Sequence, residues 1–128
     1  MPYRFLPHTA DVAVELWAGS EPGLYQAGVD ALRELLVGSS PVAPAEERAI
    51  EPRGTDPTER LIHFLADVLY LWDTERFLPA MVTASGVAGE RYDPAKHHAQ
   101  REVKAVTRHA AEVRVGEDGY RTTIIFDV

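Results

Sequence analysis

Residues 56 to 73 carry the clearest structural signal in this chain of 128 residues. Asp56 is followed by Pro57 and then by Glu59, which gives an N-cap acceptor, a first-turn proline and a back-bonding acid three positions after the cap. Apolar side chains then recur at helical spacing: Leu61, Ile62, Leu65, Ala66, Leu69 and Trp72. The pattern predicts an amphipathic helix that ends near Asp73 and buries one broad face.

A second helix is predicted closer to the N-terminus. Ser20 can cap it, Pro22 fits its first turn and Gly38 supplies its stop. Its apolar stripe has the same helical spacing and consists of Leu24, Ala27, Gly28, Ala31, Leu32, Leu35 and Leu36. Two amphipathic helices of this kind need another apolar layer to pack on.

Extended segments supply that layer. Strand-like alternation predicts strands at residues 3–7, 12–17, 102–107, 112–115 and 121–128, with a short one at 48–51. Gly116–Gly119 has the composition of a hairpin turn that leads into the last strand. We therefore expect one α+β domain over residues 1–128, with a mostly antiparallel sheet and both helices packed on one face.

Composition excludes several classes of protein. The chain has no cysteine, so a disulfide framework, a thiolate zinc site and a cysteine nucleophile are ruled out. It carries 20 acidic against 13 basic side chains, a net charge of −7, which is unfavourable for direct nucleic-acid binding. It shows no signal pattern, no membrane-length apolar run and no glycine-rich phosphate loop. A cytoplasmic protein that docks on a basic partner or binds cations is expected.

Three carboxylates stand at the ends of predicted strands. Asp127 is followed directly by the α-carboxylate of Val128, and Asp11 comes just before the strand at residues 12–17. If the first and last strands pair, these groups meet and offer the oxygen ligands that calcium prefers. The alternative is that Asp11 caps a turn and Asp127 is a solvated strand end.

Lys104 and the histidines are the other candidates. Lys104 lies among apolar residues, where it either extends to solvent or pairs with Asp127, Asp11 or a partner's anionic group. His8 precedes Asp11 by three residues, and we expect it to shape the turn because calcium disfavours imidazole. We interpret the pair at 97–98 as polar loop residues.

The remaining polar groups have ordinary explanations. His109 is interpreted as a polar residue of a strand. Glu59, His63 and Asp67 share one helix face, and we interpret that face as solvated.

Four motifs in order resemble the archease family: 3–11, 65–73, 89–97 with 102–107, and 125–128. The resemblance implies calcium binding by Asp11 and the last two residues, with Lys104 supporting activity. Archeases usually carry a full hairpin before the third motif. Only Met81–Ala88 stands there, which predicts a clipped or missing strand.

The resemblance also implies a function. Archeases assist the RtcB-type RNA ligase of tRNA splicing and RNA repair. They promote its guanylylation with GTP and manganese, restore multiple turnover and widen its nucleotide use. This chain is then a non-catalytic activator. The alternatives are a metal-dependent phosphoester hydrolase, with His8 or His109 as base, and a calcium-stabilised chaperone or scaffold.

Overall fold

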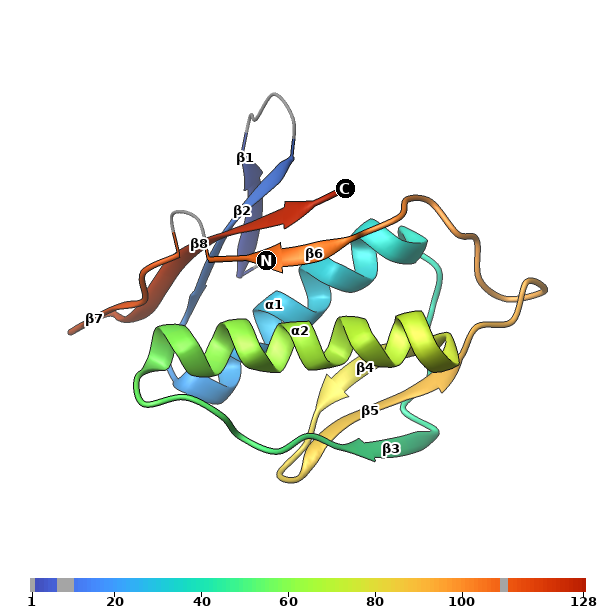
Figure 1. The fold of residues 1–128 in the computed structure, drawn as a ribbon, viewed down its shortest axis with the longest axis horizontal. Coiled ribbons are helices and arrows are strands. Elements are labelled where there is room, and N and C mark those ends of the chain that lie inside the picture. The colour runs from blue at the N-terminus through green and yellow to red at the C-terminus, as the bar shows by residue number, and fades with distance from the viewer. Residues whose placement is uncertain (1, 7–10, 109–110) are drawn as a thin grey trace.

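A computed structural model describes residues 2–6, 11–108 and 111–128. The elements along the chain alternate between strands and two long helices (Figure 1). In order they are β1 (Tyr3–Leu6), β2 (Val12–Ala18), α1 (Glu21–Val37), β3 (Glu46–Ala49), α2 (Pro57–Glu75), β4 (Phe77–Val82), β5 (Gly86–Arg91), β6 (Ala105–Thr107), β7 (Arg114–Gly116) and β8 (Gly119–Asp127).

The strands form two antiparallel sheets with the helices between them (Figure 1). One sheet has the order β1-β2-β8-β6, with β7 also paired to β8, and the other has the order β3-β5-β4. Helix α1 packs on both β2 and β4, and α2 packs on both β6 and β4. The predicted α+β class and antiparallel pairing are confirmed. The prediction of a single sheet is wrong, because β3, β4 and β5 cover the other side of the helices.

Both helices begin where the sequence predicts. The Ser20 hydroxyl accepts a hydrogen bond from the Gly23 amide at 3.1 Å, and the Asp56 carboxylate accepts one from the Glu59 amide at 2.9 Å. The Glu59 carboxylate bonds back to the Thr55 amide at 3.1 Å, one residue before the predicted partner. These bonds satisfy amides that a helix start leaves without intrahelical acceptors.

The helix ends differ more from the prediction. Helix α2 continues two residues past Asp73 and is closed by Arg76, which adopts a left-handed conformation with φ 54°. Helix α1 ends at Gly38 with φ 61°, as predicted. Among the described residues, neither helix combines the length and apolar character that a membrane span requires.

The hairpin that the sequence suggested was clipped is complete. Strand β4 starts at Phe77, directly after the α2 cap, and β5 runs to Arg91, so each strand has six residues. The prediction allowed only Met81–Ala88 for this hairpin, whereas its strands begin at Phe77 and end at Arg91. The hairpin has two full strands because β5 includes Gly89 and Glu90. Gly89 also lets β5 approach β4 closely, since a β-carbon at this position would lie 1.8 Å from the Leu78 carbonyl oxygen.

One apolar cluster joins all the layers. It contains the inner side chains of β2 and β8, the facing stripes of both helices and the inner side chains of the smaller sheet. Val14, Leu16, Ile124 and Phe126 are fully buried there. Their burial fixes the register of β2 against β8, since a shift by one residue would turn each apolar set outward.

Candidate functional site

The pairing of β2 with β8 brings two of the predicted carboxylates to one place. Val12 pairs with Phe126 in this antiparallel ladder. Asp11 directly precedes Val12 and Asp127 directly follows Phe126, so both acids stand at the same end of the paired strands. The first strand, β1, pairs with β2 and not with the last strand, whereas β2, the strand that follows Asp11, does pair with the last strand, β8. Asp11 and Asp127 are both half-buried there.

Strand β6 adds Lys104 to the same end of the sheet. Ala105 pairs with Asp127 from the other side, and the Lys104 amide donates to the Asp127 carbonyl oxygen at 2.7 Å. Continuing that register places Lys104 beside Val128. Figure 1 shows β6 and the end of β8 side by side near the C-terminus. The group formed by Asp11, Lys104, Asp127 and Val128 is called the acidic tip below.

The Asp127 side chain lies on the sheet face that the helices do not cover. Ile124 and Phe126 point into the core, so the alternating residues Ile125 and Asp127 point to the other face. The Lys104 side chain is exposed. Carboxylates on neighbouring strands at an uncovered edge suit a hard cation, which takes oxygen ligands in flexible geometry.

Further along that face, two arginines share one carboxylate. Glu15 accepts from the Arg4 guanidinium at 2.8 Å and from the Arg121 guanidinium at 3.0 Å. The Arg121 guanidinium also lies 5.5 Å from the ring centre of Trp17. Glu15 is therefore engaged in ion pairs within the sheet.

The described part of the chain contains no group of three or more His, Asp or Glu side chains placed to hold a metal. Asp11 and Asp127 are two, so a cation at the tip needs further oxygens, such as the α-carboxylate of Val128. His8 and His109 lie outside the described residues. The structure therefore places Asp11, Lys104, Asp127 and Val128 at one end of the sheet, and the prediction that they form a site stays a prediction, as does the one for His8.

The polar face of α2 is engaged in structural contacts. Asp67 accepts from the Arg53 guanidinium at 2.6 Å, and the His63 ring bonds the Arg53 carbonyl oxygen at 3.1 Å. The other His63 nitrogen accepts from the Arg108 guanidinium at 3.1 Å. The ring thus links α2 to the segments on either side of it, and the geometry gives no reason to assign it a catalytic role.

Sequence reasoning missed a buried histidine. His97, interpreted above as a loop residue, is fully buried. Its Nε2 lies 3.0 Å from a Glu90 carboxylate oxygen, and its Nδ1 accepts from the Asp93 amide at 2.9 Å. His98 beside it is exposed, as interpreted. A signal was available in the motif at 89–97, which places an acid, a turn-forming aspartate and a histidine in one short block.

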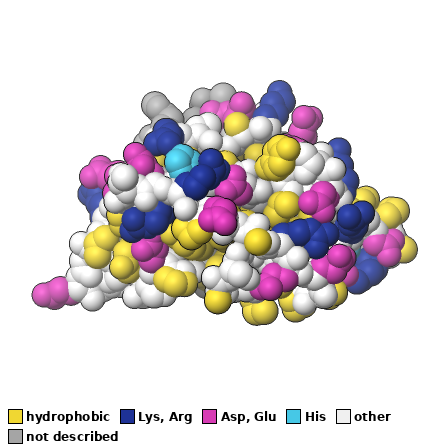
Figure 2. All heavy atoms as spheres, turned by 60° about the horizontal axis from the view of Figure 1, so that its bottom comes forward, with side chains coloured by type: hydrophobic (Ala, Val, Ile, Leu, Met, Phe, Trp, Pro, Cys, Tyr) yellow, Lys and Arg dark blue, Asp and Glu magenta, His cyan; other side chains and the backbone are white. Residues whose placement is uncertain are grey.

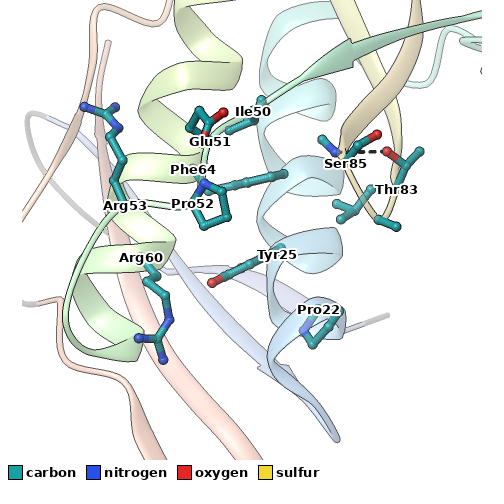
Figure 3. Close-up of a pocket in the computed structure, with 13 residues that line it drawn as sticks. Pro22, Tyr25, Ile50, Glu51, Pro52, Arg53, Arg60, Phe64, Thr83 and Ser85 are labelled. Carbon is teal, nitrogen blue, oxygen red and sulfur yellow. Dashed lines mark hydrogen bonds between the residues drawn. The ribbon is translucent and has the colours of Figure 1, made fainter.

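An apolar cavity lies at the other end of β2 (Figure 3). It has a volume of about 380 Å³ and is bounded by the N-terminal ends of α1 and α2, the β4–β5 turn and residues 50–53. The rings of Tyr25 and Phe64 stack in it, with centroids 4.9 Å apart. Glu21 accepts from the Tyr25 hydroxyl at 2.8 Å and from Arg60 at 2.7 Å.

Glu21 and Arg60 at this cavity are therefore already paired with each other. The bond from Arg60 lowers the pKa of Glu21, and burial together with the bond to Glu21 raises the pKa of Tyr25 to about 12. Figure 2 shows acidic and basic side chains intermixed over one face of the molecule, without a continuous basic area. Neither feature offers an acid–base pair or a phosphate-binding surface.

Comparisons with known proteins agree with the fold. Residues 3–128 match the family described as Archease protein family (MTH1598/TM1083). Protein archease of Methanopyrus kandleri is 34% identical, with 93% of each chain covered, and protein archease of Archaeoglobus fulgidus is 30% identical, with 100% of each covered.

Solved structures show the same fold. The solution structure of Methanobacterium thermoautotrophicum protein 1598 has a TM-score of 0.81 at 25% identity, with 99% of both chains covered. The crystal structure of an archease from Thermotoga maritima, described as a possible chaperone, has a TM-score of 0.67 at 20% identity, with 96% of this chain and 94% of that chain covered. The family match spans nearly the whole chain, and this protein belongs to the archease family.

Proposed function

We propose that this chain is a non-catalytic activator of an RtcB-type RNA ligase and that the acidic tip is the part that acts. Membership of the archease family supports the general assignment. The observation that supports the residue assignment is the strand order: β8, which ends at Asp127, lies between β2, which Asp11 precedes, and β6, which Lys104 precedes. Under this proposal the tip promotes guanylylation of the ligase by GTP.

A divalent cation, calcium first, is the proposed occupant of the tip. Asp11, Asp127 and the α-carboxylate of Val128 would hold it, and these oxygens match the donor set that calcium prefers. Bound there, the cation would supply positive charge that can orient phosphate or carboxylate oxygens. The protein's own contribution is placement, because holding reactive groups in the right geometry lowers a barrier without a covalent step.

Lys104 is proposed to contact an anionic group of the ligase or its nucleotide. Its side chain is exposed, while its amide is fixed to the Asp127 carbonyl oxygen. An ammonium on a flexible stem can follow a phosphate as a mobile point charge. The chain itself is acidic, which favours docking on a basic protein surface over direct binding to RNA.

The test measures ligase–GMP formation from GTP and manganese with and without this chain. We expect the native chain to accelerate the step, and the Asp127→Asn and Lys104→Ala variants to lose most of the acceleration. Asp118→Asn is the matched control, because Asp118 is an exposed aspartate in the turn at the other end of β8. A native chain with no effect on the rate would refute the proposal.

Calcium binding is tested separately by calorimetry on the chain alone. Asp11→Asn and Asp127→Asn should each lower the affinity at least about tenfold, since even outer partners of a metal site contribute about that much. Extension of the chain beyond Val128 should weaken binding as well. Equal affinities for the native and extended chains would remove the α-carboxylate from the site.

The chaperone alternative keeps one specific support, the description of the Thermotoga maritima archease as a possible chaperone. It predicts protection of several unrelated client proteins from aggregation, with no acceleration of guanylylation. A hydrolase would instead release phosphate from a phosphoester in the absence of any ligase. The three outcomes differ, so the assays described above and a phosphatase assay separate them.

A further inference from the structure

Residues 92–104 connect β5 to β6 as an irregular segment that ends at Lys104. Nearly all of its side chains are at least partly exposed: between Asp93 and Lys104 only His97 and Val103 are buried. Val103 is 2% exposed and belongs to the apolar core. The course of the segment over the body of the protein thus depends on two buried side chains, of which one is polar.

The polar one is held by specific hydrogen bonds. Because the Asp93 amide can only donate, Nδ1 of His97 must accept, and the ring proton therefore lies on Nε2 and is donated to Glu90. The His97 amide also donates to the Asp93 carbonyl oxygen at 2.7 Å, which closes a turn around the ring. A fully buried imidazole with both nitrogens satisfied has one position and one tautomer.

Glu90 anchors this histidine to the sheet. Its carboxylate also accepts from the Lys96 ammonium at 2.7 Å and from the Ala43 amide at 2.9 Å. These donors, with Lys96 the strongest, lower the pKa of Glu90 to about 2. The carboxylate stays ionised at neutral pH and is a strong acceptor for the His97 ring.

Between His97 and Val103 the segment is attached to the rest of the protein by individual hydrogen bonds. The His98 amide donates to the Ser40 hydroxyl at 3.0 Å, and the Gln100 amide donates to the Leu36 carbonyl oxygen at 2.8 Å. A bond of this kind contributes about 1 kcal/mol, too little to fix an exposed segment without the buried contacts at its ends. The segment then reaches the tip through the bond between Lys104 and Asp127.

We propose that His97 is a positioning residue for Lys104: its bonds to Glu90 and Asp93 fix the start of the segment that delivers Lys104 to the end of β8. The inference rests on the proposed function in one respect, the role of Lys104 in activating the ligase. The geometric part stands apart from it, because it concerns where the Lys104 backbone is held.

The test combines His97→Phe with Lys104→Ala in a double-mutant cycle on ligase–GMP formation. Phenylalanine keeps an aromatic ring at this position but cannot make the hydrogen bonds of the His97 ring to Glu90 and Asp93. We expect His97→Phe to lower the maximal acceleration about tenfold in the native background and less than about twofold in the Lys104→Ala background, as for coupled residues. His98→Phe is the matched control, since the exposed His98 ring makes no hydrogen bond or ion pair within the described part of the chain, and this variant should leave the acceleration unchanged.

A second measurement does not depend on the ligase. Hydrogen exchange at the Lys104 amide, which is protected by its bond to Asp127, should accelerate at least about tenfold in His97→Phe, with core amides of α1 unchanged. His97→Gln can keep a donor toward Glu90, and it should restore part of the protection and part of the acceleration. If His97→Phe does not fold, His97→Gln takes its place in both measurements.

The outcomes are distinct. Equal losses in both backgrounds, unchanged exchange at Lys104, or an equal effect of His98→Phe would each overturn the positioning role. A native chain that accelerates no ligase would refute the proposed function, and the exchange measurement would still decide whether His97 fixes Lys104.

Discussion

Replacing Glu90 by glutamine tests the energetics of the buried bond network directly. The native carboxylate accepts from Lys96, Ala43 and His97, and its side chain is only 14% exposed. Glutamine keeps the shape but has no charge, and its amide nitrogen must face one of these donors. We therefore expect Glu90→Gln to destabilise the fold at neutral pH.

The size of the effect follows from the pKa of Glu90, which is lowered from 4.5 to about 2. One pKa unit corresponds to about 1.36 kcal/mol, which gives a limit of about 3 kcal/mol. Lys96 is 46% exposed, and solvent screens its share of the interaction, so a loss of about 2 kcal/mol is expected.

The pH dependence gives the sharper measurement. A carboxyl group whose pKa is lower in the folded state stabilises the fold above its unfolded pKa, and this stabilisation is lost as the pH falls through the folded value. The difference in unfolding free energy between native and Glu90→Gln proteins should therefore shrink from pH 5 to pH 2. Urea unfolding at intervals over that range measures it.

The control is Glu47→Gln, on the exposed strand β3. The Glu47 side chain makes no ion pair or hydrogen bond within the described part of the chain, so its variant should differ from the native protein by a small, constant amount. Parallel stability curves for the native and Glu90→Gln proteins would show that this carboxylate is not stabilised in the folded state, and the reasoning would fail.

Three further outcomes are expected. Gly89→Ala should destabilise by more than about 3 kcal/mol in urea unfolding, because its β-carbon would meet the Leu78 carbonyl oxygen at 1.8 Å. Asp56→Ala should cost about 1 kcal/mol through loss of the α2 cap, measured in the same way. Burial and carboxylate bonds raise the pKa of Tyr3 and of Tyr25 to about 12, so a spectrophotometric titration should show two late phenolic transitions, and each Tyr→Phe variant should remove one.

The helices were predictable because their signals are local. Capping residues, first-turn prolines and an apolar stripe all lie within the element that they specify, and both helix starts are confirmed. The end of α2 was less predictable than the helix starts, since Arg76 closes the helix in a left-handed conformation that favours glycine. Its guanidinium lies 4.8 Å from the ring centre of Trp72, a stabilising contact that no local pattern indicates.

The division into two sheets could not be predicted in the same way. Which strands pair is decided by packing between segments distant in sequence, and the short strand β3 carries only charged residues and alanine at its surface. The start of β4 at Phe77 was missed because the prediction considered only Met81–Ala88 for this hairpin. In the structure Pro79 lies inside an edge strand next to an irregularity in register, a position that tolerates the missing amide.

The acidic tip and the His97 network mark the two limits of prediction from this sequence. The position of the tip follows from strand pairing: once β2 and β8 pair through their apolar faces, Asp11 and Asp127, which flank the Val12–Phe126 pair, stand at the same end of the sheet. His97 has no such constraint, because residues 92–104 follow no period from which burial could be inferred. The histidine is buried because Glu90, at the end of β5, offers an ionised acceptor that offsets the cost of removing an imidazole from water. The block from Gly89 to His97 is thus one physical unit: the glycine lets β5 approach β4, and the glutamate then meets the histidine that the turn at Asp93 places against it.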